Sequence, residues 1–270
     1  MSIVFIGGGN MASALIGGLI AHGQAPSDIR VVEIQPDAAA RLRADWGIET
    51  YSEALPALEG AGTLVLAVKP QSLRAVLASL PRLGSDVRVI SVAAGIRTDS
   101  LSRWLHGHVN VVRAMPNTPA LVRQGTAGLY AMAGVSKEDR LHAQSLLRAV
   151  GSVVWVEKES DLDAVTAVSG SGPAYVYYLM EAMIKAARSL GLSEATASQL
   201  VQDTVLGAAQ LAKSATEGPE SLRRKVTSPG GTTEAAIAVF EQEQMESTVA
   251  QAIQAATRRA RDLGEQLDRD

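Results

Sequence analysis

The sequence contains no cysteine, which excludes disulfides, thiolate catalysis and metal sites built on cysteine. It has no run of the ~20 apolar residues that a membrane-spanning helix needs. Basic residues do not cluster, and the formal net charge is -3, so neither nucleic acid nor an anionic membrane is expected as a partner. The first residues, MSIVFIGGGN, lack the features of a secretory signal and lead directly into a predicted strand. We therefore expect a cytoplasmic protein.

Histidine is scarce as well, with only His22, His106, His108 and His142 in the chain. His106 and His108 lie close together in WLHGHVN, and no carboxylate stands in that stretch. Two imidazoles without a further ligand are more typical of surface residues than of a metal site. The sequence therefore predicts no bound metal.

The 270 residues are enough for one large domain or two modest ones. In the first part of the chain, short apolar runs alternate with helical patterns. The predicted strands are residues 3–6, 29–34, 63–68, 87–92, 109–113 and 153–156, and the helices between them include residues 11–22, 38–46 and 71–80. Several strands are apolar without alternation, as in a parallel sheet that is covered on both faces. This order predicts a doubly wound, mostly parallel α/β domain.

Helical periodicity replaces this alternation after residue 157, and no convincing strand follows Pro173. Two apolar stripes have helical spacing: Val176, Met180, Met183, Ile184, Ala187 and Leu190, and then Met245, Val249, Ile253, Ala256, Ala260, Leu263 and Leu267. The second stripe is narrow, and either core packing or an oligomer interface would explain it. We therefore predict two domains, residues 1–157 and residues 158–270.

A glycine turn joins the first strand to a helix in IVFIGGGNMASALIGGL. Gly7 would permit the tight turn, Gly9 would let the backbone approach a pyrophosphate, and Ala12 is small enough for close helix–strand packing. The pyrophosphate would lie on the N–H groups at the positive end of the helix. Because the turn follows a strand and opens an amphipathic helix, dinucleotide binding is favoured over a glycine-rich turn without a ligand.

Glu33 follows the second predicted strand, where an acid typically accepts a hydrogen bond from the ribose 2′-hydroxyl of NAD and repels a 2′-phosphate. Arg41 and Arg43 come soon after it and could instead bind a phosphate. The residues therefore leave both NADH and NADPH open.

Three further strands end in turns that would meet at the same edge of the sheet. Lys69 and Pro70 follow one of them, and small residues that leave room for a flat ring follow the next. The complete predicted cofactor site is Ile6, Gly7, Gly8, Gly9, Asn10, Met11, Glu33, Ala67, Val68, Lys69, Pro70, Ala93, Ala94, Gly95, Met115, Pro116 and Asn117.

The chain lacks the base that an alcohol substrate would need. The segment AVSGSGPAYVYYLMEAMIKAA resembles the glycine-rich helix start of the β-hydroxyacid dehydrogenases, which carry a catalytic lysine one turn into that helix. Residues 174–177 contain no lysine, and Lys185 lies too far along to replace it. A protonated imine accepts hydride without a proton delivered by the enzyme in the same step, so binding and orientation suffice.

A second unusual segment, VTSPGGTTEAAIAVF, places a proline and two glycines among hydroxyl residues before a predicted helix. Such a segment is either a simple helix start or an anion-binding turn. We call residues 228–233 the cradle.

Five motifs, IGGGNMASALIGGL, LAVKPQ, RAMPNTPA, DAVTAVSGSGPAYVYYLMEAM and VTSPGGTTEAAI, resemble those of the pyrroline-5-carboxylate reductase family in order and spacing. The resemblance spans essentially the whole chain. It implies reduction of 1-pyrroline-5-carboxylate to L-proline with NADPH or NADH, the last step of proline biosynthesis. It also implies a Rossmann domain (residues 1–157), a helical substrate-binding and dimerisation domain (residues 158–270), and a homodimer that in some members assembles into a homodecamer.

Site residues follow from the same resemblance. The catalytic residues are Thr233, which would hydrogen-bond the ring nitrogen of the substrate, and Ser228. The substrate-binding residues are Gly230, Gly231, Thr232, Thr233, Ser171, Gly172, Pro173 and Glu159, with Ala174 beside them. Because the family completes its active site across the dimer, a monomer is expected to be inactive. VVEIQPD lacks the hydroxyl or basic residues of members that prefer NADPH, so NADH is expected to work comparatively well.

Two alternative functions stay open at this point. A related cyclic-imine reductase would act on a substrate such as piperideine carboxylate. Its ring has one more methylene group, and a site distinguishes two substrates that differ in this way by only ~1–3 kcal/mol. A non-catalytic dinucleotide sensor would bind the cofactor without turnover, although it would not need a cradle for a carboxylate.

Overall fold

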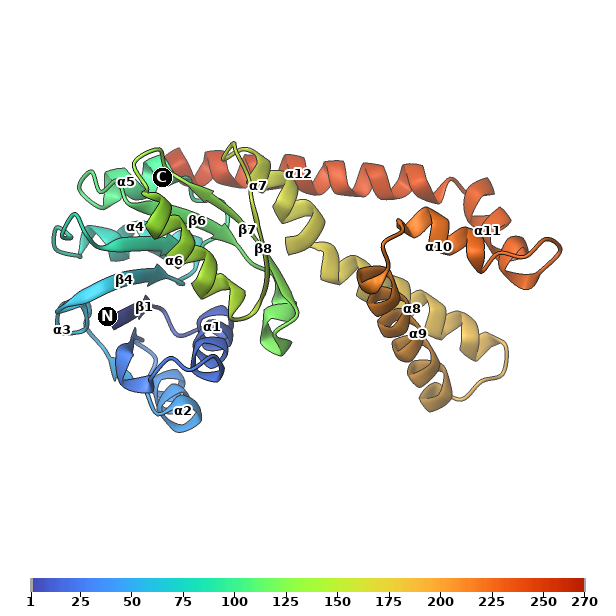
Figure 1. Cartoon of the computed structure of the whole chain (residues 1–270), viewed down its shortest axis with the longest axis horizontal. Helices are drawn as coiled ribbons and strands as arrows, with labels where there is room; N and C mark the ends of the chain where they lie inside the picture. Colours follow the sequence, from blue (N-terminus) through green and yellow to red (C-terminus); the bar gives the residue numbers. More distant parts are fainter. Residues whose placement is uncertain (1, 270) are drawn as a thin grey trace. The chain divides into compact units, whose positions relative to one another are not determined.

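The computed structural model describes residues 2–269 and divides the chain into two compact units (Figure 1). The first unit comprises Met1–Ser171 and Ala255–Asp270, and the second comprises Gly172–Gln254. No helix within residues 2–269 combines the length and the hydropathy that a membrane crossing requires.

An eight-stranded sheet forms the centre of the first unit, in the order β3-β2-β1-β4-β5-β6-β7-β8. Its strands are β1 (Ser2–Ile6), β2 (Ile29–Val32), β3 (Glu49–Tyr51), β4 (Ala61–Leu66), β5 (Arg88–Ser91), β6 (Val111–Met115), β7 (Gly125–Ala131) and β8 (Gly151–Trp155). All neighbouring strands are parallel except β6 and β7, which are antiparallel. The predicted doubly wound, mostly parallel fold is confirmed.

Helices cover both faces of the sheet (Figure 1). One face packs on α1 (Asn10–Ala21), α2 (Pro36–Trp46) and α6 (Lys137–Arg148), and the other on α3 (Ala54–Leu58), α4 (Pro70–Ala78) and α5 (Thr98–Trp104). Successive residues of β1 alternate between the two cores: Phe5 is fully buried in the first, and Val4 is fully buried in the second. This double burial explains why the strand is apolar at every position from Ile3 to Ile6.

Two strands were not predicted, and two were shifted by two residues. β4 lies at Ala61–Leu66, two residues before the predicted range of 63–68. β3 has only three residues, and the seven residues of β7 include two glycines and two alanines, which are uncommon in strands. β6 begins at Val111 and ends at Met115, two residues beyond the predicted range of 109–113. β7, which was not predicted, pairs with β6 in the antiparallel direction.

The first unit extends past residue 157, where the sequence predicts a domain boundary. α7 (Asp161–Val165) and the π-helix η3 (Thr166–Gly170) belong to it, because Leu162 and Ala167 are fully buried there. The last part of α12 (Met245–Arg269) also belongs to it, with Leu267 packed against the second core cluster. The compact units thus divide at Ser171, while the predicted domains 1–157 and 158–270 stay a prediction.

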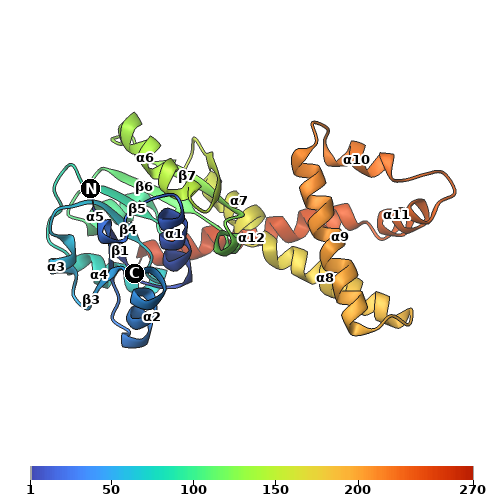
Figure 2. The same cartoon turned by 60° about the horizontal axis from the view of Figure 1, so that its bottom comes forward.

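The second unit is helical, and none of its described residues lies in a strand. It contains α8 (Gly172–Ser189), α9 (Glu194–Ser214), α10 (Pro219–Lys225), α11 (Thr232–Gln242) and the beginning of α12. α8 and α9 contact each other and lie side by side in both views (Figures 1 and 2).

Burial in the second unit is sparse, because Ala197 and Val201 are its only buried side chains among the described residues. Large apolar side chains are exposed on α8, α9, α11 and α12, including Tyr178, Leu206 and Phe240. Exposed apolar surface of this extent marks an interaction surface. The unit therefore lacks a core of its own in the single chain.

Candidate functional site

The glycine turn connects β1 to α1. Gly7 has a φ of 97°, and a Cβ there would lie 2.8 Å from Val68 Cγ1 and 2.9 Å from the Ala67 carbonyl oxygen. Only glycine suits that conformation and that space. Gly9, the N-cap of α1, has ordinary backbone angles and nothing within 4 Å of the place where its Cβ would be. The backbone at the helix N-terminus is thus open to an anion, as a pyrophosphate site requires.

A cavity of 700 Å³ opens beside this turn. It brings together eight of the predicted cofactor residues: Ile6, Gly7, Gly8, Gly9, Glu33, Ala67, Val68 and Lys69. They come from the ends of β1, β2 and β4, which are neighbours in the sheet. The position agrees with the rule that doubly wound sheets bind ligands beyond the carboxyl ends of their strands.

The same cavity is lined by residues that the sequence reasoning missed: Val32, Ile34, Gln35, Ser52, Glu53, Ala54, Leu55, Ser72, Val76 and Ser79. Ser52 and Glu53 follow β3 directly. Since β3 is too short to show as an apolar run, no signal pointed to the turn after it. Ile34 and Leu55 are 74% and 62% exposed, an unusual state for two apolar side chains on the wall of one cavity.

The Glu33 carboxylate is held at the rim of this cavity by two backbone groups. Its Oε2 accepts a hydrogen bond from the Gly8 N–H at 2.9 Å, and its Oε1 accepts one from the Gln35 N–H at 2.8 Å. One acid thereby connects the glycine turn with the start of α2.

Other predicted cofactor residues do not line this cavity. Asn10 and Met11 begin α1, Pro70 begins α4, and Ala93, Ala94 and Gly95 follow β5. A Cβ on Gly95 would lie 3.2 Å from Leu267 Cδ1 of α12. The side of Gly95 on which a Cβ would lie thus faces α12, and the predicted place of Gly95 beside a flat ring stays a prediction.

Met115, Pro116 and Asn117, at the end of β6, lie near the π-helix η3. The Asn117 side chain donates to the Ser169 carbonyl oxygen at 3.1 Å and accepts from the Thr126 N–H at 2.8 Å. The Met115 methyl group contacts Gly170 closely enough that a Cβ there would be 2.7 Å away. These contacts place Ser171 next to the β6 end. A π-helix frequently marks a functional site, and the sequence gave no sign of this one.

Glu159 makes an ion pair inside the first unit. Its Oε1 lies 3.2 Å from Arg113 Nη1 and accepts the Thr98 N–H at 2.7 Å, while its Oε2 accepts the Thr98 hydroxyl at 2.8 Å. The Arg113 side chain is buried, with 3% of its surface exposed. Burial also raises the pKa of Asp163, and the positive charges of Arg113 and Arg97 partly offset this rise. These partners favour a structural role for Glu159, and its predicted place beside the substrate amine stays a prediction.

Replacing Glu159 with glutamine should lower the free energy of unfolding by about 2 kcal/mol, because Arg113 would keep its buried charge without this anion. Urea unfolding of the variant, with the exposed Glu157→Gln as the matched control, measures the effect. Unchanged stability together with lost reductase activity would instead place Glu159 at the substrate.

The cradle lies in the second unit, immediately before and at the start of α11. Gly230 has a φ of 72°, which favours glycine, and its N–H donates to the Glu234 carboxylate at 2.7 Å. The Gly231 N–H donates to the Ser228 carbonyl oxygen at 3.0 Å. The turn is thus fixed by its own hydrogen bonds.

The first turn of α11 keeps backbone donors available. Its N-cap, Gly231, provides no side-chain cap, and no described group accepts a hydrogen bond from the N–H of Thr232 or Thr233. The Thr233 hydroxyl lies on the same turn. This arrangement offers amides, hydroxyls and the positive end of an 11-residue helix to a carboxylate.

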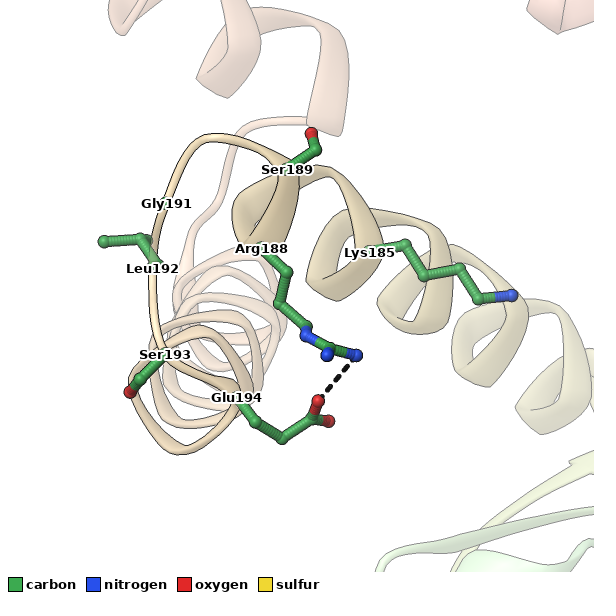
Figure 3. A pocket seen from close by; sticks show the side chains of 7 residues that line it. All are labelled: Lys185, Arg188, Ser189, Gly191, Leu192, Ser193 and Glu194. Carbon is green, nitrogen blue, oxygen red and sulfur yellow. Dashed lines mark ion pairs between the residues drawn. The ribbon is translucent and has the colours of Figure 1, made fainter.

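The turn between α8 and α9 carries another cavity, of 520 Å³. Figure 3 shows Arg188 directed at Glu194, with Nη1 and Oε2 2.7 Å apart, while Lys185 points away from this pair. Lys185 is itself paired with Glu181. Because both cations already have a carboxylate, this cavity has no unpaired charge that would favour an ionic ligand.

Within residues 2–269, no three histidine, aspartate or glutamate side chains gather closely enough to hold a metal ion.

Similarity to known proteins extends over both units. Residues 159–263 match the family described as pyrroline-5-carboxylate reductase dimerisation, and residues 2–95 match that described as NADP oxidoreductase, coenzyme F420-dependent. A pyrroline-5-carboxylate reductase of Pseudomonas aeruginosa is 49% identical over 266 residues, which cover 98% of this chain and 97% of the relative. The chain belongs to the pyrroline-5-carboxylate reductase family.

Solved structures of this family are similar to the chain over nearly its full length. A pyrroline-5-carboxylate reductase of Coxiella burnetii has a TM-score of 0.90 at 41% identity, covering 97% of this chain and 98% of that one. A pyrroline carboxylate reductase of Plasmodium falciparum, solved with NADP bound, has a TM-score of 0.84 at 27% identity, covering 98% of each. The family predicted from the five motifs is confirmed, and so is a nicotinamide dinucleotide as the cofactor class.

Proposed function

We propose that the protein reduces 1-pyrroline-5-carboxylate to L-proline with a reduced nicotinamide dinucleotide, the last step of proline biosynthesis. The observation that carries the proposal is the cradle, where Thr232 and Thr233 offer backbone N–H groups at the positive end of α11. A dinucleotide cavity beside the glycine turn supports it. Such a reductase would act in the cytoplasm, where reduced nicotinamide cofactors are supplied.

The substrate is an anionic cyclic imine, and each part of it matches a group of this chain. Ser228 and Thr232 would bind the carboxylate through their hydroxyls, together with the N–H groups of the first turn of α11. Gly230 and Gly231 would shape the turn that holds these groups in place. The Thr233 hydroxyl would accept the hydrogen of the protonated ring nitrogen and fix the ring for attack. Ser171, Gly172 and Pro173 would lie against the reacting rings.

When bound, the reduced dinucleotide supplies the hydride. The protein supplies no proton in that step, because the imine nitrogen is already protonated. This explains how the site can work with hydroxyls and amides where an alcohol dehydrogenase needs a base.

The direct test mixes the purified full-length protein with pyrroline-5-carboxylate and follows the loss of reduced-nicotinamide absorbance, with proline formation measured in parallel. We expect one proline for each dinucleotide oxidised. No oxidation, with cofactor binding intact, would favour the non-catalytic sensor. Faster turnover of piperideine carboxylate than of pyrroline-5-carboxylate would favour the related imine reductase.

We also propose that the working form is a homodimer through the second unit, which assembles further into a homodecamer. The exposed apolar side chains of α8, α9, α11 and α12 support an interface between copies, as does the match of residues 159–263 to a dimerisation family. Because the site would be completed across the dimer, dilution should lower the specific activity in parallel with dissociation.

Analytical ultracentrifugation at the assay concentrations would measure that dissociation. A dissociated monomer that kept its full specific activity would contradict the shared site.

A further inference from the structure

We infer that this protein selects NADH over NADPH and that Glu33 makes the selection. The inference concerns cofactor binding, and it rests on the proposed function only for its kinetic readout. The family alone does not decide the matter, since dinucleotide enzymes of one fold differ at the residue that follows the second strand.

The first observation is that Glu33 is fixed in place. Its two carboxylate oxygens each accept a backbone N–H, from Gly8 at 2.9 Å and from Gln35 at 2.8 Å. Turning the side chain away from a 2′-phosphate would break both hydrogen bonds and leave the partly buried Gly8 N–H without this partner, which is costly. Glu33 therefore cannot easily make room for a second negative group.

The second observation is the balance of charge around the cavity. Glu33 and Glu53 are its anionic lining residues, and Lys69 is its cationic one. Lys69 follows β4, whereas Glu33 follows β2, and β1 lies between these two strands. The positive charge thus lies across the glycine turn from the acid that would meet the 2′-position.

The third observation concerns the arginines that the sequence offers for a phosphate. Neither Arg41 nor Arg43 lines the cavity, and the guanidinium of Arg43 donates to the hydroxyl of Thr50 in β3. A 2′-phosphate would therefore meet an anchored carboxylate without an arginine to neutralise it. Like charges brought together in this way discriminate strongly between ligands.

NADH fits the same surroundings. Each oxygen of Glu33 has a lone pair left after its backbone hydrogen bond, so the carboxylate can still accept the ribose 2′-hydroxyl. Ile34 and Leu55, both exposed on the cavity wall, offer apolar surface to the adenine ring. Both features favour an adenosine without a 2′-phosphate.

The test measures the Kd of NADH and of NADPH by titration calorimetry, and kcat/KM for each in the reductase assay, using the full chain. We expect NADH to be favoured at least about tenfold in both quantities. In Glu33→Gln, the ratio should fall to within about threefold, mainly through better NADPH binding. Glu53→Gln, which removes the same charge from the same cavity but does not remove the carboxylate anchored by Gly8 and Gln35, should lower the ratio less than Glu33→Gln does.

Equal or tighter binding of NADPH by the natural protein would overturn the inference, and so would an equal shift in Glu53→Gln. A second variant, Arg43→Gln, keeps the inference testable even if Glu33→Gln does not fold. NADPH binding should be unchanged there, and a loss of more than about threefold would show that this arginine does bind the phosphate. Selective NADH binding without turnover of pyrroline-5-carboxylate would support the inference and refute the proposed function.

Discussion

Replacing Thr233 with valine should lower kcat/KM for pyrroline-5-carboxylate by about 100- to 1,000-fold, the usual effect of removing one hydrogen-bonding group that orients a reacting centre. Valine keeps the shape of the side chain at the start of α11 and removes only its hydroxyl. The Kd of the dinucleotide should not change, because the glycine turn and its cavity belong to the first unit.

The matched control is Thr227→Val, just before the cradle. The Thr227 hydroxyl donates to the Arg223 carbonyl oxygen at 2.7 Å, so this variant loses a structural hydrogen bond and no proposed substrate contact. We expect it to keep kcat/KM within about threefold of the natural protein and to lose some stability. Equal losses of activity in the two variants would remove Thr233 from its proposed role.

Replacing Gly9 with alanine should raise the Kd of the dinucleotide by about 100-fold, equivalent to about 2.7 kcal/mol, and leave the fold intact. Nothing lies within 4 Å of the new Cβ, and the backbone angles of Gly9 suit any residue, so the chain should accept the methyl group. The methyl group would fill the space that the pyrophosphate needs on the N-terminus of α1.

Gly218→Ala provides a matched control for this change. Gly218 is also a helix N-cap with extended backbone angles and nothing within 4 Å of its Cβ position, but it precedes α10 in the second unit and does not line the dinucleotide cavity. We expect unchanged dinucleotide binding in Gly218→Ala, measured by the same calorimetry. Normal dinucleotide affinity in Gly9→Ala would show that the pyrophosphate binds elsewhere.

The sequence predicted those parts of the fold that have strong local signals. β1 is apolar because both of its faces are buried, and the glycine turn after it combines a positive φ at Gly7 with open backbone at Gly9. β7 escaped prediction because its glycines and alanines weaken the strand pattern, and β3 because three residues make no pattern. As a consequence, the part of the cofactor cavity that follows β3 was missed.

The parts of the candidate site that could not be predicted from the sequence depend on contacts between residues far apart in the chain. No local pattern shows that Gly8 and Gln35 would hold the Glu33 carboxylate, or that Arg113 and Thr98 would pair with Glu159. The contact between Gly95 and α12 likewise joins segments that are distant in sequence. Motif order could predict the family, because each motif lies within one short segment.

The most direct test of the central claim is transfer of deuterium from NADH in which both hydrogens on the reactive carbon of the nicotinamide ring are deuterium. We predict that proline will carry a single deuterium on the ring carbon that was double-bonded to nitrogen, because that carbon receives the hydride. Proline without the label, or dinucleotide bound without proline formation, would contradict the account of this chain as an imine reductase.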